Sequence, residues 1–142
     1  MKKTLITLVL LAVLALAGCQ SATDTLVDRD TIVNDDDACV YVTRTVSFDS
    51  DGGYVAFDGF DGAMTLTRII ANSETTLSFS APRGSRLFQL VLVDSYDNIR
   101  VIEEDFPVTL DDGTYTLKLI GKGATGTVFV SISQTGIQSV TQ

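Results

Sequence analysis

The fold is decided by residues 114–119, which read TYTLKL. In an extended chain the Tyr and Leu side chains of this segment fall on one side, and the Thr and Lys side chains fall on the other. Residues 127–133, TVFVSIS, repeat the alternation, with Phe129 on the polar side. Alternation of period two is typical of a β-strand with one buried face. We therefore predict two strands, joined by the glycine-rich residues 121–126 as a flexible hairpin turn.

Two further segments refine this picture. Residues 87–93, LFQLVLV, are apolar on both faces, which predicts a strand that is covered on each side. Further upstream, Met64, Leu66 and Ile70 are predicted to share a buried face. Arg68 interrupts that set, so we expect the strand to bulge or to lie at an edge of the sheet there.

Short alternating runs of this kind continue through residues 38–134, separated by Gly, Asp, Asn or Pro about every eight to twelve residues. No helical pattern of about ten residues follows residue 18. The sequence therefore predicts an all-β fold over residues 38–134. We expect a single antiparallel β-sandwich of about eight strands, of jelly-roll or immunoglobulin-like type.

Several features of residues 75–132 occur in a recognisable order. They are Leu77 and Phe79, the turn Pro82-Arg83-Gly84-Ser85, the long apolar strand, Gly113-Thr114-Tyr115 and a glycine-rich hairpin. This order resembles the small sandwiches of pre-peptidase C-terminal type. Those domains usually carry a pair of aspartates within the long strand, where this chain has the single Asp94. The resemblance implies a secreted accessory module that binds or stabilises and does not catalyse.

The start of the chain has the pattern of a bacterial export signal. Lys2 and Lys3 precede a run of apolar residues that extends to Leu16 and is too short to span a bilayer. Residues 16–19, LAGC, resemble the lipobox of bacterial lipoproteins. The resemblance implies that residues 1–18 are a signal peptide, and that a diacylglyceryl group and a further acyl chain such as palmitate are attached to Cys19.

The lipobox also implies a location. Two or more acyl chains hold a protein on a membrane, where one alone binds reversibly. In the lipoproteins that this chain resembles, Asp after the cysteine retains the protein at the inner membrane, and this chain has Gln20 there. We therefore expect a lipid-anchored protein of the bacterial cell envelope, on the outer membrane where the cell has two membranes.

Charge limits the partners that we expect. The chain has 142 residues, with 18 Asp and Glu against 10 Lys and Arg, and a formal net charge of −8. Without residues 1–18, which hold two lysines and no acid, the remaining 124 residues carry about −10. An acidic surface repels phosphate backbones and anionic headgroups. We expect no nucleic-acid partner, and contact with the membrane through the lipid alone.

Two residue types limit the chemistry. The sequence has no histidine, so it lacks a Ser-His-Asp apparatus and imidazole-ligated zinc, and we predict that it is not an enzyme. Once Cys19 is lipidated, Cys39 is the remaining cysteine. A free cysteine in an alternating apolar run usually behaves as a small buried hydrophobe. The alternatives are an intermolecular bridge or a reactive thiol.

The residues on either side of the sandwich are predicted to be irregular. Residues 19–37 are rich in Ser, Thr and Asp with few apolar side chains, so we predict a flexible tether. A linker of that length has an average reach of about 25 Å. Residues 135–142 are predicted to be a polar C-terminal tail.

Four aspartates in two glycine-containing loops are candidate calcium ligands. Asp49 and Asp51 precede Gly52 in an Asp-x-Asp-Gly pattern that resembles half of a calcium loop, and Asp58 and Asp61 lie in the following loop. The closing glutamate of a calcium loop is absent, and Asp-Gly is also the usual turn of a β-hairpin. We favour turns, and keep Asp49 and Asp51 as candidate ligands of calcium, the one cofactor considered.

Ligand binding on a sandwich commonly uses exposed aromatic rings. Tyr54, Phe57, Phe60 and Tyr96 are candidates to stack on sugar rings, although each is also a candidate core or loop residue. Our leading hypothesis is a lipid-anchored, non-enzymatic binding or structural module, with an envelope protein or a glycan as its partner. The alternative is a carbohydrate-binding or calcium-stabilised accessory domain.

Overall fold

The computed structural model describes residues 25–72, 74–82 and 86–134. Within them are eight strands and one short helix: α2 (Arg29–Val33), β1 (Ala38–Val40), β2 (Thr43–Asp49), β3 (Gly52–Ala71), β4 (Thr75–Ser80), β5 (Arg86–Asp94), β6 (Ile99–Ile102), β7 (Val108–Leu110) and β8 (Gly113–Gln134). No helix in this part of the chain has the length and apolar character needed to cross a bilayer. The predicted signal peptide, Cys19 and the C-terminal tail lie outside the described residues.

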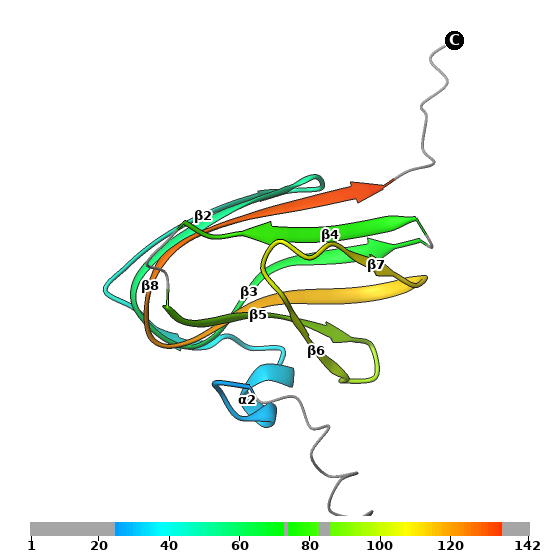
Figure 1. Cartoon of the computed structure of the whole chain (residues 1–142). Helices are drawn as coiled ribbons and strands as arrows, with labels where there is room; N and C mark the ends of the chain where they lie inside the picture. Colours follow the sequence, from blue (N-terminus) through cyan, green and yellow to red (C-terminus); the bar gives the residue numbers. More distant parts are fainter. Residues whose placement is uncertain (1–24, 73, 83–85, 135–142) are drawn as a thin grey trace, which may run out of the picture.

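Two long strands, β3 and β8, form the centre of the sheet and pair antiparallel along most of their lengths. Both bend near the middle, so that the sheet folds over into two layers (Figure 1). The first layer contains β2, the start of β3, the end of β8, β4 and β7. The second contains β1, the end of β3, the start of β8, β5 and β6. The predicted all-β sandwich of about eight strands is confirmed.

Residues 121–126 do not form the predicted hairpin turn. They belong to β8, which runs without interruption across the bend. Opposite them β3 shifts register at Phe60, between Gly59, with φ of +59°, and Gly62, with φ of +108°. Glycine adopts such angles without steric cost, and a Cβ on Gly62 would lie 2.0 Å from a backbone oxygen of β1. The glycines therefore let two paired strands turn together, and the expected hairpin partners are two halves of one strand.

The main hydrophobic core lies between the two layers. Its largest fully buried side chains include Phe60, Met64, Leu77, Leu90 and Leu117. Phe60 lies at the bend, and its ring packs edge-on against Phe57 at 5.9 Å between centroids. Side chains from both halves of β3 and β8 enter this core, so the bend and the packing of the layers depend on each other.

The prediction that residues 87–93 are covered on both faces is confirmed for the second half of that segment. Leu90 and Leu92 point into the main core, whereas Val91 and Val93 point to the outside of the second layer. All four are nearly inaccessible to solvent. The outward pair is covered by α2, which explains why β5 needs apolar residues on both sides.

A bulge in β3 between Thr65 and Thr67 changes the pattern of buried residues. Beyond it, Ile69 is 3% exposed in the core and Ile70 is 76% exposed. The prediction that Ile70 is buried was therefore wrong, because the extra residue moves the later side chains to the opposite face. The predicted irregularity at Arg68 is confirmed as a bulge, and Arg68 projects from the outside of the second layer.

The predicted tether over residues 19–37 is wrong in the part that contains α2. The helix begins after Asp28, whose carboxylate accepts hydrogen bonds from the backbone and hydroxyl of Thr31 at 3.0 and 2.8 Å. These bonds lower the pKa of Asp28, the hydroxyl having the larger effect. Ile32 is fully buried in a second apolar cluster with Val91. The few apolar residues of this segment are enough to dock it on the sheet.

Candidate functional site

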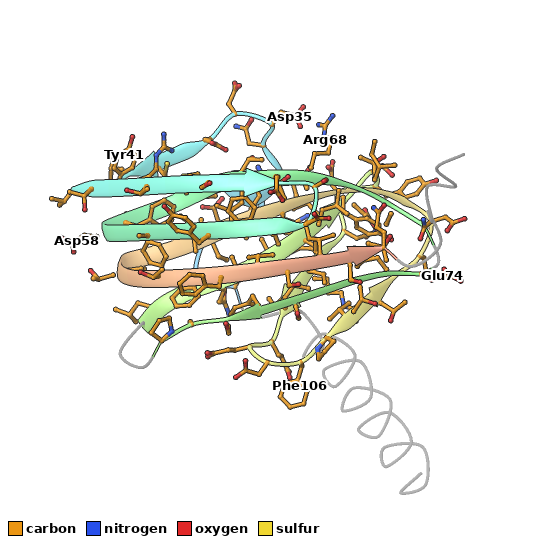
Figure 2. The ribbon with its side chains drawn as sticks, turned by 90° about the horizontal axis from the view of Figure 1, so that it is seen from above. Asp35, Tyr41, Asp58, Arg68, Glu74 and Phe106 are labelled. Atoms are coloured by element: carbon orange, nitrogen blue, oxygen red, sulfur yellow. The ribbon has the colours of Figure 1, made fainter. Side chains whose placement is uncertain are left out.

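The outside of the first layer is lined with hydroxyl groups, and no helix of the described residues lies over it (Figure 1). Figure 2 looks onto this layer. The side chains that alternate with the core residues of β2, β4 and β8 are Thr43, Thr45, Ser47, Thr76, Ser78, Ser80, Thr127, Ser131 and Ser133. Together with the outward residues Tyr54, Ala56 and Phe129 we call this surface the hydroxyl face. None of these positions carries a charge, and the two aspartates that project from the same side, Asp49 and Asp58, lie at the ends of β2 and of its pairing with β3.

A pair of aromatic rings lies within the hydroxyl face. Tyr54 and Phe129 are direct partners in the pairing of β3 with β8. Their ring centroids are 6.2 Å apart, with 40° between the ring planes. Tyr54 is 38% exposed and Phe129 is 50% exposed. Beside Phe129 is a hollow of about 290 Å³ that is also lined by Ser80, Asp105 and Pro107. The face therefore combines an apolar platform with hydrogen-bonding groups.

The four aromatic residues that we predicted from the sequence as candidates for sugar stacking lie in different parts of the structure. Phe57 and Phe60 are buried in the core and cannot meet a ligand. Tyr96 is 84% exposed in the turn between β5 and β6, away from the hydroxyl face. Only Tyr54 joins an aromatic surface, and its partner Phe129 was not among the candidates. The sequence did contain the signal, because the alternation had already placed Phe129 on the solvent side of its strand.

The candidate calcium ligands Asp49 and Asp51 lie at the turn between β2 and β3, and both are exposed. Asp49 accepts a hydrogen bond from the backbone N–H of Asp51 at 2.8 Å, which is a local turn interaction. At the bend, Asp58 accepts from the Thr125 hydroxyl at 2.7 Å, and Asp61 accepts from a backbone N–H of β8 at 2.8 Å. Among the described residues, no three or more Asp, Glu, Cys or His side chains form a metal-binding group.

Cys39 lies in β1, where it is half-buried and packs against the main core. Burial raises the pKa of its thiol, and the negative charge of Asp37 adds to the effect. A raised pKa keeps the thiol protonated and therefore a weak nucleophile. The environment of Cys39 supports the interpretation as a small hydrophobe.

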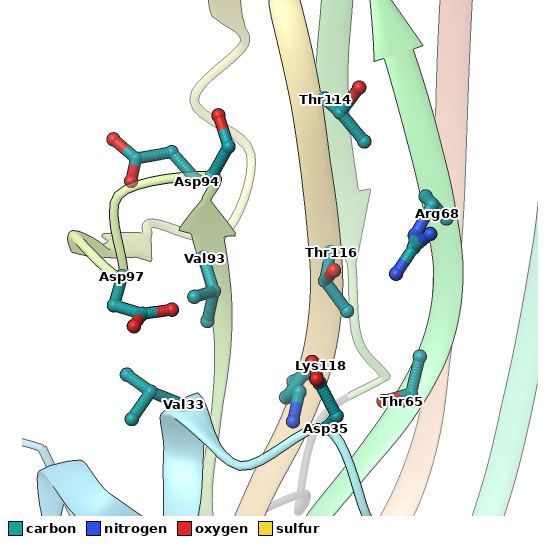
Figure 3. Close-up of a pocket in the computed structure, with 11 residues that line it drawn as sticks. Val33, Asp35, Thr65, Arg68, Val93, Asp94, Asp97, Thr114, Thr116 and Lys118 are labelled. Carbon is teal, nitrogen blue, oxygen red and sulfur yellow. The ribbon is translucent and has the colours of Figure 1, made fainter.

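A second surface feature was not predicted from the sequence. On the outside of the second layer, a cleft of about 660 Å³ lies between β3, β5 and the segment after α2 (Figure 3). Its lining includes Arg68, Thr116, Lys118, Asp35 and Asp97. These residues are far apart in the sequence, and only the bulge in β3 and the docking of α2 bring them together.

Comparison with models of protein families, with curated proteins and with solved structures finds no match to this chain.

Proposed function

We propose that this protein is a lipid-anchored, non-enzymatic binding module of the bacterial cell envelope, held in the membrane through Cys19. Support for the anchor comes from the lipobox-like residues 16–19 behind a signal-peptide pattern. Support for a role without catalysis comes from the absence of histidine from all 142 residues. With Gln20 after the cysteine, the outer membrane is the expected location in a cell with two membranes.

The observation that carries the binding role is the hydroxyl face. The chain has a formal charge of −8, yet the middle of this face is uncharged and carries two partly exposed aromatic rings, with the carboxylates of Asp49, Asp58 and Asp105 only at its edges. Aromatic side chains provide large contact areas at low cost in conformational entropy. A flat face with rings among hydroxyl groups suits contact with an uncharged partner.

The anchor is tested by fractionation of cells that express the wild type or the Cys19→Ala variant. We expect the wild type in the membrane fraction, labelled by radioactive fatty acid. The variant should carry no label and should be found either in the soluble fraction or as a precursor that keeps its signal peptide. Equal distribution of the two proteins, with no label in either, would exclude lipid anchoring.

A neutral carbohydrate is the ligand class that the hydroxyl face favours. Sugar rings present apolar C–H faces that stack on aromatic rings, and their hydroxyl groups exchange hydrogen bonds with Ser and Thr. Tyr54 and Phe129 supply the stacking surface, and Thr45, Ser47 and Ser131 lie on the neighbouring strands. No Lys or Arg belongs to the hydroxyl face and the charges at its edges are carboxylates, which disfavours an acidic glycan.

An array of neutral oligosaccharides tests this ligand class. We expect binding by the wild type, a loss of about tenfold or more in the Tyr54→Ala and Phe129→Ala variants, and no change in Tyr96→Ala, which removes an exposed ring elsewhere. No signal above background, together with recovery of a stable protein partner by crosslinking in the native envelope, would replace the glycan by a protein.

A further inference from the structure

The cleft on the second layer has an arginine on one side and aspartates on the other, and a further carboxylate, that of Asp35, lies beside Lys118 (Figure 3). Arg68 projects from β3 on one side, and Asp97 projects from the turn between β5 and β6 on the other. The floor between them is formed by Thr116 of β8 and Val93 of β5 (Figure 3). The cleft lies on the opposite side of the sandwich from the hydroxyl face, so it is independent of the proposed glycan surface.

Arg68 is available to a ligand. The bulge in β3 turns this residue outward, and the register pairs it with Thr116. Within the described part of the chain, its guanidinium group has no hydrogen bond or ion pair. In Figure 3 the guanidinium points over the floor of the cleft. A guanidinium is well suited to bind a carboxylate through two parallel hydrogen bonds.

Lys118 shapes the cleft from below. Its side chain is only 3% exposed, and its ammonium group donates a hydrogen bond to the backbone oxygen of Asn34, just after α2. That bond holds the following residue, Asp35, at the rim. Lys118 is therefore a positioning residue that also adds positive charge beneath the side of the cleft where Arg68 lies.

The side of the cleft near the turn between β5 and β6 carries two carboxylates. Within the described residues, that of Asp94 is hydrogen-bonded to the protein and that of Asp97 is not. Asp94 accepts hydrogen bonds from the backbone N–H groups of Tyr96 and Asn98 and from the Asn98 side chain, so it holds the turn together. Asp97 donates its backbone N–H within this turn, and its carbonyl accepts from Arg29. The Asp97 carboxylate has no hydrogen bond in the described residues, and in Figure 3 it points toward the cleft.

The separation of the two sides sets the size of the ligand. Arg68 in β3 and Val93 in β5 both pair with Thr116, so the backbones of the two sides are two strand spacings, about 10 Å, apart, and Asp97 lies in the turn just beyond the end of β5. A single amino acid is too short to join them, whereas a peptide extends by about 3.5 Å per residue. We propose that this cleft binds a short peptide of two or three residues, with its terminal carboxylate on Arg68 and its terminal ammonium on Asp97.

Calorimetric titration with trialanine tests the proposal on the full chain, purified in detergent. We expect saturable binding that weakens by about tenfold when the peptide is N-acetylated, and by a similar factor when it is C-amidated. The Arg68→Gln variant is expected to bind trialanine and its amide equally weakly. Asp97→Asn is expected to bind trialanine and its acetylated form equally weakly. Each variant thus loses the ability to recognise one peptide end.

The control variant is Arg100→Gln, which removes an exposed arginine that does not line this cleft, and it should bind trialanine as the wild type does. Arg68 and Asp97 are exposed, so their variants should melt at nearly the wild-type temperature. No binding of trialanine to the folded wild type at millimolar concentration would overturn the proposal. Equal affinity for acetate and trialanine would also overturn it, because the site would then recognise a carboxylate alone.

Discussion

The two outer faces of this sandwich are built largely from the same two strands and are opposite in character. On the first layer, the outward residues of β8 include Thr127, Phe129 and Ser131, and nothing in the described chain covers them. On the second layer, Ile120 projects outward from the same strand and is fully buried beneath α2. The chemistry of an outward position therefore follows what covers it and not which strand it belongs to.

The comparison distinguishes side chains that stabilise the fold from those that are free to bind. Apolar residues under α2 contribute to stability, because burial removes them from water. The rings of the hydroxyl face gain less from folding, since they stay partly in water. Each substitution below tests that distinction, beginning with the core that both faces share.

The largest loss of stability is expected for Phe60→Ala at the bend. Phe60 is fully buried between the layers, and its removal should lower the free energy of unfolding by about 3–5 kcal/mol. Urea unfolding followed by circular dichroism measures the change. The matched control is Phe106→Ala, because Phe106 is 64% exposed and its loss should cost less than about 1 kcal/mol. Equal losses would mean that the bend is not part of the core.

The next largest loss of stability is expected for a residue of α2, and it is compared with the loss for a residue of the hydroxyl face. Ile32→Ala should cost about 2–4 kcal/mol, because loss of this fully buried side chain of α2 leaves a cavity between the helix and the sheet. Phe129→Ala on the hydroxyl face should cost less than about 1 kcal/mol. The same urea titration measures both. If Phe129→Ala proves as costly as Ile32→Ala, the hydroxyl face is part of the stable core and the contrast between the faces fails.

Lys118→Met tests the polar contact that holds the segment after α2. The substitution keeps an apolar stem of similar length but removes the hydrogen bond to Asn34, so we expect a loss of about 1–2 kcal/mol. Lys122→Met is the control, since Lys122 is exposed at the bend. A gain in stability would instead show that burial of the ammonium group costs more than its hydrogen bond returns.

A smaller change in stability, which depends on pH, is expected when Asp94 is substituted. The side chain of Asn98 is the main cause that lowers the pKa of Asp94 below its ordinary value of 3.8, with backbone N–H groups of the turn assisting. A lowered pKa means that the ionised carboxylate stabilises the fold at neutral pH, and that this contribution disappears as the pH falls below 3.8.

Calorimetric melting of the wild type and Asp94→Asn should therefore differ slightly at neutral pH and converge in acid. The Asn98→Ala variant removes the main donor and should reduce the same pH dependence. A difference between wild type and Asp94→Asn that grows as the pH falls would contradict the assignment.

The smallest change in melting temperature is expected on addition of calcium. The hydrogen bond between Asp49 and Asp51 gives these residues a role in the turn without an ion. We expect the full chain and its Asp51→Ala variant to show the same melting temperatures in millimolar calcium as in chelator. A ligand present at a hundred times its dissociation constant adds about 2.7 kcal/mol, so a rise of several degrees in the wild type alone would establish a calcium site.

Local pattern was enough to predict the sandwich but not its bend. Alternation placed residues 114–119 and 127–133 in strands, because one side of each must be buried. The glycines between them suggested a turn, and the sequence alone does not show that β3 bends at the same point and keeps the ladder paired. At the bulge in β3, Arg68 did signal a change of face, but Ile70 was assigned to the wrong side.

The functional surfaces were harder to predict because they depend on contacts between distant segments. Tyr54 was a candidate, yet its pairing with Phe129 follows from the register of β3 with β8. The cleft needs Arg68, Lys118 and Asp97 to meet across three strands, and no local pattern indicates that. The docking of α2 was missed because four apolar residues among many polar ones suggested a tether, and tertiary contacts alone compensate for the ordering cost.

The docked helix also sets how far the protein could stand from a membrane under the proposed attachment through Cys19. The backbone N–H of Leu26 donates to the side chain of Gln89 at 2.9 Å, so within the described residues the chain is already attached to the body of the sandwich at Leu26. With a lipid on Cys19, seven Cα steps separate the anchor from this contact, a span of at most about 25 Å. A free chain over residues 20–37 would allow about 65 Å. If the proposed lipid anchor holds, the protein is confined to a thin zone above the bilayer, where it can meet partners close to the surface and not those deep in the surrounding space.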